Sequence, residues 1–366
     1  MKEKFLVLGI GAAQADLLEK ITESFEVHAL SNSQNGPGLK YVDFFALIDI
    51  GDKDAVLDYA KENQIDFVYS IGSDIAMPTV TYVAENLGLP SFISHETASI
   101  CNNKVTLRES LREIYGSVNY EVISAREQTT KIPMPVVIKP VDSQGQRGVQ
   151  TITELEKIPD AFSTAVSYSK CGLAIIEEKI EGQEISVNTY MVNGKIKLFL
   201  PSDRVSWSGL DGGLIHKHVL PTKMSEKVIN NVWRLVEETA ATLNIKNGPV
   251  YYQIKVRECS PYLIEVTPRL DGCHLWRLIK KSTGIDLLEE TISHLCRNSA
   301  SIPEHIETMK LVLEFFCQPP DTLFSKPVTA QEAIYTQWYY KPGEIIRRIN
   351  GKMEKCGFQI VASSKK

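Results

Sequence analysis

The chain has 366 residues and a mass of 41.0 kDa, a length that corresponds to two or three domains. Hydrophobic residues make up 43% and charged residues 23%, which is typical of globular proteins and excludes a wholly disordered chain. Lys and Arg number 40 against 45 Asp and Glu, and the resulting net charge of -5 argues against nonspecific nucleic-acid binding. Small anionic ligands held by a few well-placed cations remain compatible with this balance.

Seven cysteines are scattered along the sequence without a C-x-x-C pair. This pattern favours reduced thiols in the cytoplasm over a disulfide framework or a zinc site. No apolar run approaches the ~18 residues of a membrane-spanning helix, so no membrane partner is expected. Lys2 and Lys4 before the apolar stretch 5–13 leave a secretory signal as the alternative, but Glu3 interrupts the basic region and a folded unit follows. We therefore expect a cytoplasmic protein.

The first hundred residues alternate short apolar runs with helical patterns. The apolar runs lie at 5–8, 27–30 and 67–71. This alternation predicts βαβ units and a parallel, Rossmann-like sheet. Gly9-x-Gly11 matches the start of a dinucleotide fingerprint, but Gln14 stands where the third glycine belongs, and no acidic residue follows the second strand. A structural unit is therefore favoured, with a NAD-linked oxidoreductase as the weaker alternative.

The pattern then changes to hairpins and longer helices. After a helix expected over 103–114, a strand at Pro135–Pro140 carries Lys139 into the polar, glycine-bearing loop 142–148, and a second strand follows at 149–152. The further expected elements are a helix at about 153–168, a strand at 174–178, a hairpin around 192–195, a helix at 225–244, strands at 250–256 and 262–267, and a helix at 285–296.

Two of these segments carry side chains suited to a nucleotide. Lys139 ends a strand before the loop, where its charge and the loop amides can meet phosphates. Glu177 and Glu184 flank a short connection between strands and can bind an adenine amino group and two ribose hydroxyls. Each segment by itself is more typical of a solvated loop or a charged, solvated connection.

Two later segments carry side chains suited to a divalent cation. Gln253 and Glu265 lie on adjacent expected strands, and paired oxygen donors of this kind can hold Mg²⁺ together with substrate phosphates. Arg269 follows closely and can stabilise charge on a transferring phosphoryl group.

Taken in order, these segments resemble the ATP-grasp superfamily, and its carbamoyl-phosphate-synthase-like and biotin-carboxylase-like ligases in particular. The matching stretches are Asn103-Lys104, Pro-Val-Val-Ile-Lys-Pro with its loop, Glu-Glu-Lys-Ile-Glu-Gly-Gln-Glu-Ile-Ser-Val, and Tyr-Leu-Ile-Glu-Val-Thr-Pro-Arg-Leu-Asp-Gly. Gly-Ser-Asp-Ile-Ala-Met-Pro after the third strand is similar to the pre-ATP-grasp domain. The resemblance implies an α/β fold: a Rossmann-like pre-ATP-grasp domain (1–102), then a two-lobed α+β domain made of a linker helix with a lid subdomain (103–182) and a large subdomain with a C-terminal extension (183–366).

The resemblance also implies roles for individual residues. Arg269 and Lys139 would be catalytic, and Glu177 and Glu184 would bind adenine and ribose. The ATP-binding set would be Lys104, Lys139, Ser143, Gln144, Gly145, Gly148, Glu177, Glu178, Lys179, Ile180 and Glu184. The Mg²⁺ ligands would be Gln253, Glu265 and Thr267.

The metal set departs from the family in two ways. Relatives usually carry Asn where this chain has Thr267, and a hydroxyl bridges two metals less well than an amide carbonyl. Gln253 is neutral where many relatives have an acid, although the carbamoyl-phosphate-synthase branch also has glutamine there. Glu265 is then the single carboxylate for one or two ions of Mg²⁺ or Mn²⁺. A nucleotide-binding protein without ligase activity is therefore the second hypothesis.

The implied reaction transfers a phosphoryl group from ATP to a small carboxylate, releasing ADP, and an amine (less often a thiol) then attacks the acyl phosphate. Catalysis would come from positioning and charge stabilisation under a lid that excludes water. The expected partners are the small-molecule carboxylate and amine, and a second copy of the chain is compatible because many relatives dimerise.

Substrate contacts are expected from polar residues around the predicted phosphate site. Arg204 can grip a carboxylate bidentately, although a salt bridge to a nearby acid is an equal alternative. His216 is expected to line the site and to share a strand face with His218. Asp271 and His274 follow the last motif and are expected beside the substrate.

Overall fold

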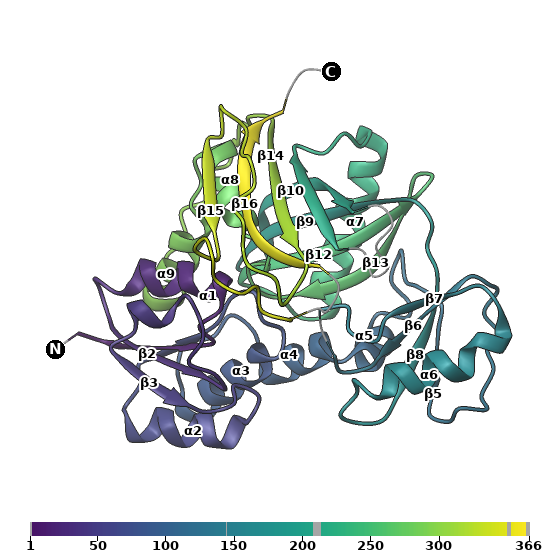
Figure 1. The fold of residues 1–366 in the computed structure, drawn as a ribbon, viewed down its shortest axis with the longest axis horizontal. Coiled ribbons are helices and arrows are strands. Elements are labelled where there is room, and N and C mark those ends of the chain that lie inside the picture. Colours follow the sequence, from purple (N-terminus) through teal and green to yellow (C-terminus); the bar gives the residue numbers. More distant parts are fainter. Residues whose placement is uncertain (1, 144, 208–213, 350–352, 364–366) are drawn as a thin grey trace.

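Three sheets organise the chain in this computed structural model, which describes residues 2–143, 145–207, 214–349 and 353–363. Figure 1 shows the N-terminal domain in purple and blue, the lid in teal as a separate lobe, and the large subdomain in green and yellow. Each sheet lies within one of the expected segments 1–102, 103–182 and 183–366, and the boundary residues themselves stay a prediction. No helix in the described ranges is long and apolar enough to cross a bilayer.

The N-terminal sheet is parallel, with strand order β3-β2-β1-β4, and it confirms the predicted βαβ pattern. Every residue from Phe5 to Leu8 is fully buried, as expected for a central strand covered by helices on both faces. The elements are β1 (Lys4–Leu8), α1 (Ala12–Ile21), β2 (Glu26–Ser31), β3 (Phe44–Leu47), α2 (Lys53–Glu62), β4 (Phe67–Tyr69), α3 (Ala76–Leu87), α4 (His95–Asn102) and α5 (Lys104–Ser110).

The lid contains a four-stranded antiparallel sheet of order β5-β8-β6-β7 with a small core of its own. The predicted hairpin is confirmed, because Val136 pairs with Ile152 across the loop. Phe162 of the helix packs on the sheet residues Ile138 and Ile176. The elements are β5 (Tyr120–Ile123), β6 (Val136–Pro140), β7 (Gln150–Ile152), α6 (Ile158–Val166) and β8 (Ala174–Glu178).

The large subdomain contains an eight-stranded sheet of order β13-β12-β9-β10-β11-β14-β16-β15, in which every pairing is antiparallel. Helices cover both faces: Trp233 of α7 packs on Phe199, whereas Tyr190, on the opposite face, bonds to the Glu290 carbonyl of α9. The elements are β9 (Gln183–Val192), β10 (Lys195–Ser206), β11 (Ile215–Leu220), α7 (Glu226–Thr242), β12 (Gly248–Arg257), β13 (Ser260–Thr267), α8 (Leu275–Thr283), α9 (Leu287–Arg297), β14 (Leu311–Gln318), β15 (Tyr335–Trp338) and β16 (Glu354–Ala362).

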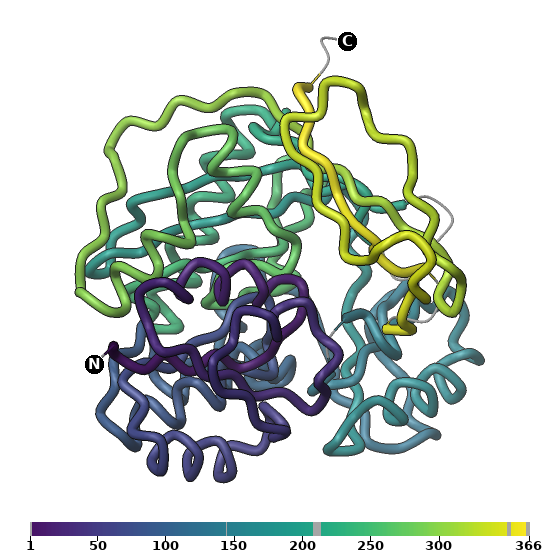
Figure 2. Tube along the Cα trace, turned by 60° about the vertical axis from the view of Figure 1, so that its left-hand side comes forward, coloured from purple at the N-terminus to yellow at the C-terminus, as the bar shows by residue number. Residues whose placement is uncertain are grey.

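The N-terminal domain packs against the large subdomain through one continuous hydrophobic core, whereas the lid has a separate core. Figure 2 shows this arrangement, with the purple N-terminal elements directly beneath the green helices. The fold therefore pairs a rigid two-domain body with one smaller lobe, and the predicted site residues lie where the three parts meet.

Candidate active site

The predicted metal ligands meet where β12 and β13 run antiparallel. Gln253 lies directly opposite Glu265, and Thr267 lies opposite Tyr251, so these side chains share one face of the sheet. The Thr267 hydroxyl is buried without a hydrogen-bond partner. The Glu265 carboxylate makes no hydrogen bond or ion pair with any residue that the structure describes. Unpartnered oxygens in a row are the donors that a hard divalent cation takes, so these residues fit Mg²⁺.

Three cations from three different elements surround Glu265. Burial raises its pKa and the neighbouring carboxylate of Asp74 raises it further, while Lys104, Arg269 and Lys139 act in the opposite direction. These cations come from the start of α5, from β6 and from the turn after β13. We call Glu265 and the three cations the charge cluster. Lys139 and Arg269 are also paired with Glu177 and Asp74, and this gathering of cations beside Glu265 suits a magnesium–triphosphate complex.

Glu177 lies at the base of this cluster, buried on β8. Its carboxylate accepts from Arg108 Nε at 3.0 Å and from Lys139 Nζ at 2.5 Å. Burial would raise the pKa of Glu177, but the charges of Arg108 and Lys139 outweigh this and lower it to about 2. Both carboxylate oxygens are thus held by cations, and the predicted contact between Glu177 and adenine stays a prediction.

Lys104 lies in the first turn of α5, where the Asn103 side chain caps the helix by accepting from two backbone N–H groups. Its Nζ donates to the Ser143 carbonyl at 2.7 Å, which links the helix to the loop predicted to cover the phosphates. Burial lowers the pKa of Lys104. A phosphate in the charge cluster would favour the charged form again.

The loop that follows β6 is fixed at its base. Asp142 accepts a hydrogen bond from the Ser169 hydroxyl at 2.8 Å. Gly145 and Gly148 have positive φ angles of 67° and 70°, which turn the backbone back toward β7. Gln144 lies outside the described residues. The loop has the anchored ends and glycine-rich tip that a phosphate lid requires.

The connection between β8 and β9 presents backbone groups, as predicted for the adenine edge. The Lys179 N–H donates to the Pro135 carbonyl at 3.2 Å. The Lys179 carbonyl and the Ile180 N–H make no hydrogen bond to the described residues, and this acceptor and donor match the edge of an adenine ring. Glu178 instead pairs with Arg257 at 2.7 Å on the outer side.

Glu184 on β9, the predicted ribose ligand, contacts a predicted substrate residue and a predicted metal ligand. Its carboxylate accepts from both Arg204 of β10 and Gln253 of β12. The structure therefore shows the salt bridge that was the alternative to a substrate clamp at Arg204, although the buried Arg204 Nε still lacks a partner. The predicted ribose, metal and substrate residues are adjacent on one sheet face.

Arg269 is held by an acid that the sequence analysis did not single out. Its Nε donates to Asp74 Oδ1 at 2.9 Å, its Nη2 donates to the same oxygen, and its Nη1 donates to the Leu270 carbonyl at 2.9 Å. Asp74 belongs to the N-terminal domain, in the loop after β4. The carboxyl ends of parallel strands are the usual ligand edge of such sheets, and this was the signal available in the sequence.

The two histidines of β11 do not share a face, because a β-bulge shifts the register between Val205 and Ser206. His218 lies opposite Arg204, buried, with both ring nitrogens unpartnered. His216 instead bonds to Glu314 at 3.0 Å. The expectation of a shared face was wrong, and His216 lies on the sheet face away from Arg204.

The side chains of Asp271 and His274 both make hydrogen bonds to other residues of the protein. Asp271 accepts from the N–H groups of Cys273 and Leu275 at 2.8 and 3.0 Å, which fixes the start of α8. His274 is 1% exposed, and its Nδ1 bonds to Asp16 of α1 at 2.9 Å. A direct contact of either side chain with substrate stays a prediction.

The glycine turn after β1 lies against the side chain of Gln14. The buried Gln14 side chain donates to the Ile71 carbonyl. A Cβ atom added at Gly11 would lie 2.8 Å from Gln14 Oε1, and one at Gly9 would lie 3.2 Å from Gln14 Cδ. The glutamine that replaces the third glycine thus covers the turn, which agrees with a structural unit.

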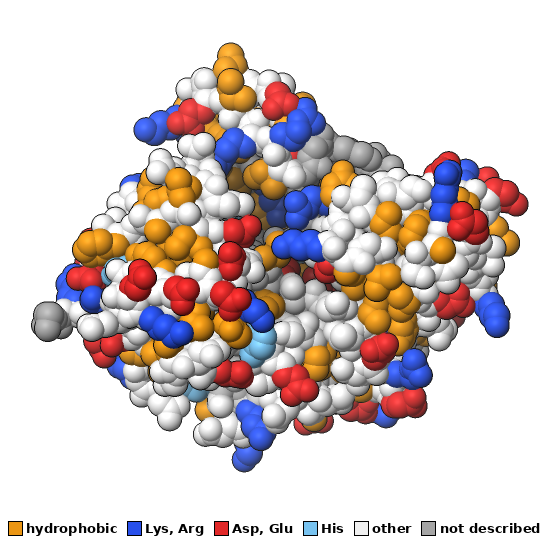
Figure 3. All heavy atoms as spheres, turned by 90° about the horizontal axis from the view of Figure 1, so that it is seen from below, with side chains coloured by type: hydrophobic (Ala, Val, Ile, Leu, Met, Phe, Trp, Pro, Cys, Tyr) orange, Lys and Arg blue, Asp and Glu red, His pale blue; other side chains and the backbone are white. Residues whose placement is uncertain are grey.

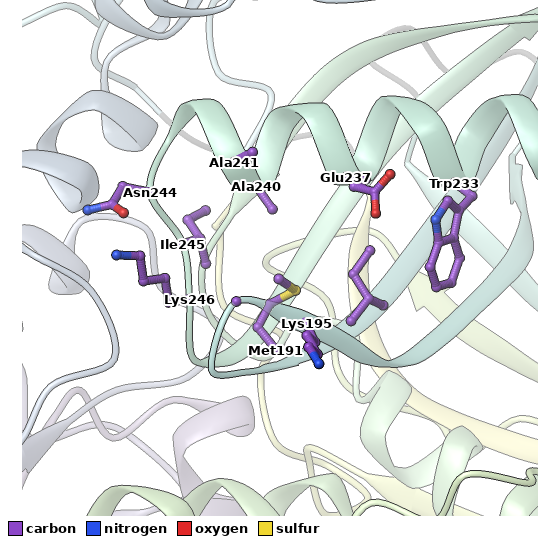
Figure 4. A pocket seen from close by; sticks show the side chains of 11 residues that line it. Met191, Lys195, Trp233, Glu237, Ala240, Ala241, Asn244, Ile245 and Lys246 are labelled. Atoms are coloured by element: carbon purple, nitrogen blue, oxygen red, sulfur yellow. The ribbon is translucent and has the colours of Figure 1, made fainter.

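Basic side chains gather around the hollow at the centre of the face shown in Figure 3. A separate cavity of about 490 Å³ lies between the β9–β10 hairpin and α7 (Figure 4). It is lined by Met191, Trp233, Glu237 and Lys246 among others, and by none of the predicted site residues. The cavity is therefore separate from the charge cluster.

Residues 132–275 match the family model of the ATP-grasp domain. The chain is 21% identical over 287 residues to the carbamoyl phosphate synthase large chain of Thermoanaerobacter pseudethanolicus, an alignment that covers 77% of this chain and 26% of that protein. The chain thus spans about a quarter of that relative's length. It is 24% identical over 399 residues to phosphoribosylamine–glycine ligase of Methanocaldococcus jannaschii, covering 98% of this chain and 88% of that one.

The fold is similar to the crystal structure of an L-amino acid ligase from Bacillus licheniformis, with a TM-score of 0.78 and 18% identity over 98% of this chain and 93% of that one. The matched segment spans every predicted site residue except Lys104. A Rossmann-like domain, a lid and a large antiparallel lobe meet at one charge cluster, and the chain therefore contains an ATP-grasp domain within the architecture of ATP-grasp enzymes.

Proposed function

We propose that the protein is an ATP-dependent ligase that activates a small carboxylate as an acyl phosphate, with release of ADP, for attack by an amine. The observation that carries this proposal is the charge cluster, in which three cations surround an unpaired carboxylate beside the orphaned Thr267 hydroxyl. The named activities of the phosphoribosylamine–glycine ligase and of the L-amino acid ligase support it, because both join a carboxylate to an amine.

Each residue of the cluster has a defined task in this reaction. Lys104 and Lys139 bind the phosphate oxygens and offset their charge. Glu265, with Gln253 and Thr267 beside it, would hold Mg²⁺, and the ion would supply charge neutralisation for the phosphates. The loop 142–148 closes over the triphosphate and keeps water away from the acyl phosphate.

Arg269 stabilises the phosphoryl group as it leaves ADP and bonds to the carboxylate oxygen of the substrate. The amine nitrogen then attacks the acyl carbon and expels inorganic phosphate. No side chain forms a covalent bond in either step, so positioning and charge supply the catalysis.

The second candidate, a nucleotide-binding protein without ligase activity, rests on Thr267. Thr267 offers a hydroxyl in place of the usual amide carbonyl, and Gln253 is neutral, so Glu265 is the single carboxylate and a second Mg²⁺ would be bound weakly. A NAD-linked oxidoreductase is not favoured because Gln14 covers the glycine turn. We further propose a cytoplasmic location, small-molecule carboxylate and amine partners, and a homodimer as the assembly to test first.

Release of ADP from Mg·ATP, measured with a panel of small carboxylates with and without an amine, tests the ligase proposal. We expect one carboxylate class to stimulate ADP release and the amine to raise it further. Binding of Mg·ATP with no stimulation by any member of a broad panel would favour the second candidate. Absence of Mg·ATP binding would contradict both.

A further inference from the structure

We propose that Asp74 is a positioning residue for Arg269, and that the N-terminal domain thereby takes part in recognising the γ-phosphate of ATP. This inference rests on the proposed function, because it requires Arg269 to face that phosphate. None of the predicted site residues lies in the N-terminal domain, and this inference assigns that domain its first functional residue.

The contact between Asp74 and Arg269 joins residues 195 positions apart in the sequence. One carboxylate oxygen of Asp74 accepts from both Nε and Nη2, and the Leu270 carbonyl accepts from Nη1. A guanidinium carries five N–H groups, so one on each terminal nitrogen remains for a phosphate. The two fixed edges determine the plane in which those remaining groups point.

The loop that carries Asp74 is docked tightly on the turn after β13. Gly72 N–H donates to the Leu270 carbonyl at 3.1 Å. Gly72 has a positive φ of 66°, and a Cβ atom added there would lie 3.1 Å from Gly272 Cα. Because the backbones touch at glycines, the position of Asp74 relative to Arg269 is set by main-chain packing and not by a flexible side chain.

Asp74 differs in its position from Lys20, another charged residue that joins the two domains. Lys20 of α1 pairs with Glu289 of α9 at 2.7 Å on the surface, remote from the charge cluster. Asp74 instead bonds to Arg269, which follows the predicted metal ligand Thr267 by two residues. Asp74 therefore acts on the reacting end of the site, and Lys20 provides a matched control for domain contact alone.

The test compares the dissociation constants of a non-hydrolysable ATP analogue, Mg·AMPPNP, and of Mg·ADP by calorimetry. Their ratio reports recognition of the γ-phosphate and needs no knowledge of the carboxylate. The proteins are the full chain, Asp74→Asn, Arg269→Gln, the double variant, Asp74→Glu and Lys20→Met. Melting temperatures of all of them are measured alongside, so that loss of fold is separated from loss of recognition.

Loss of the Asp74 charge also reduces repulsion of both nucleotides, and the ratio removes most of that shared effect. We expect Asp74→Asn and Arg269→Gln each to lower the preference for AMPPNP about tenfold, the size of a charge-assisted hydrogen bond. The double variant should lie within about twofold of Arg269→Gln, because both changes remove one interaction. Asp74→Glu should recover part of the preference, and Lys20→Met should keep all of it.

An unchanged ratio in Asp74→Asn, or losses that multiply in the double variant, would overturn the proposal. So would an unchanged ratio in Arg269→Gln, because Arg269 would then not face the γ-phosphate. A full chain that binds neither nucleotide would remove the proposed function itself and this inference with it. If Asp74→Asn has a much lower melting temperature, the ratio of the two dissociation constants in Asp74→Glu is compared with that in Lys20→Met. An unchanged ratio in Asp74→Glu would then overturn the proposal.

Discussion

Glu265 combines partial burial with the absence of any hydrogen-bond or ion-pair partner among the described residues. Burial of a carboxylate costs stability unless nearby cations or a bound metal ion offset its charge. Its burial and the neighbouring Asp74 raise the pKa of Glu265, and a bound divalent cation would lower it.

The variant Glu265→Gln should lose turnover and keep most of its nucleotide affinity. The amide removes the charge that holds the metal, whereas Lys104 and Lys139 still bind the phosphates. ADP release and calorimetric binding of Mg·ATP check the two halves of this prediction. The control is Glu181→Gln, an exposed carboxylate paired with Lys179. Turnover near that of the unmodified protein would show that the metal assignment is wrong.

Glu177 has the opposite character, since its carboxylate is fully paired in the interior. Because its folded-state pKa of about 2 lies below the ordinary value, the ionised group stabilises the fold at neutral pH. That contribution is lost as the pH falls from about 5 toward 2, when the carboxylate takes up a proton.

The variant Glu177→Gln should therefore lower the free energy of unfolding by about 3 to 5 kcal/mol at pH 7, because it leaves Arg108 and Lys139 without their counter-charge. The difference from the unmodified protein should shrink at pH 3. Urea unfolding at both pH values measures it. Glu178→Gln, which removes a more exposed pairing with Arg257, should change stability by under about 1 kcal/mol. An equal loss in the two variants at pH 7 would contradict the buried-pair interpretation.

At the scale of elements, the connection between β8 and β9 depends on one backbone contact. Gly182 has a φ of 137°, and a Cβ atom there would lie 2.0 Å from the Val256 carbonyl oxygen. The backbone of the predicted adenine edge can approach β12 this closely because Gly182 has no side chain.

The variant Gly182→Ala should therefore lose more stability than Gly172→Ala. Gly172 also has a positive φ, of 71°, but a Cβ atom there meets nothing within 4 Å. Gly172→Ala should cost about 1 kcal/mol from its backbone angle, and Gly182→Ala should cost at least ~2 kcal/mol more from overlap with the backbone. Urea midpoints measure both. A similar loss in the two variants would mean that the β8–β9 connection moves to accommodate the added methyl group at little cost. The affinity for Mg·ATP should then be unchanged.

Much of the element pattern was readable from the sequence because it is local. Turn residues predict the β6–β7 hairpin and the β9–β10 hairpin, whose turn contains Asn193. Side-chain periodicity predicts the long helix α7. The edge strand β3 was not expected, because it has only four residues, of which Phe44 and Leu47 are exposed, and its signal is weak. The pairing of β14 with β11 was also not predictable, since nothing local specifies a strand partner about a hundred residues away.

The same limit applied to the site. Lys139 and Glu265 lie in recognisable strands and Arg269 follows one, and the structure brings the three side chains near one another. Two further ion-pair partners could not be predicted: Arg108, which pairs with Glu177, lies inside a helix, and Asp74, which pairs with Arg269, lies in another domain. Contacts of that kind depend on tertiary packing and leave no periodic trace in the chain.

At the scale of the whole molecule, the N-terminal domain is joined to the start of α8 by a buried acid. Asp16 accepts from His274, Trp276 and Arg277. Burial raises its pKa, but the hydrogen bonds from His274 and Arg277 outweigh this and lower it to about 2. Together with Asp74, this contact makes two of the three lobes a single unit, against which the lid can close.

A nucleotide bound between these lobes should stabilise all of them. Mg·ATP at about 100 times its dissociation constant should add roughly 2.7 kcal/mol and raise the melting temperature, whereas NAD should not, because Gln14 covers the glycine turn. Thermal unfolding with each ligand checks the preference. A shift with NAD but not with Mg·ATP would contradict the ATP-binding proposal and favour NAD binding at the glycine turn.

The position of β16 in the large sheet has a consequence for biosynthesis. This strand, Glu354–Ala362, lies between β14 and β15 although it comes last along the chain. Until it leaves the ribosome, β14 presents an unpaired edge, and edges of that kind recruit strands from other chains. At roughly 5–20 residues per second, the ribosome needs several seconds to synthesise the chain from β14 to β16. Crowded polysomes would thus favour aggregation of this protein during that interval, and a chaperone that covers hydrophobic strand edges would protect it.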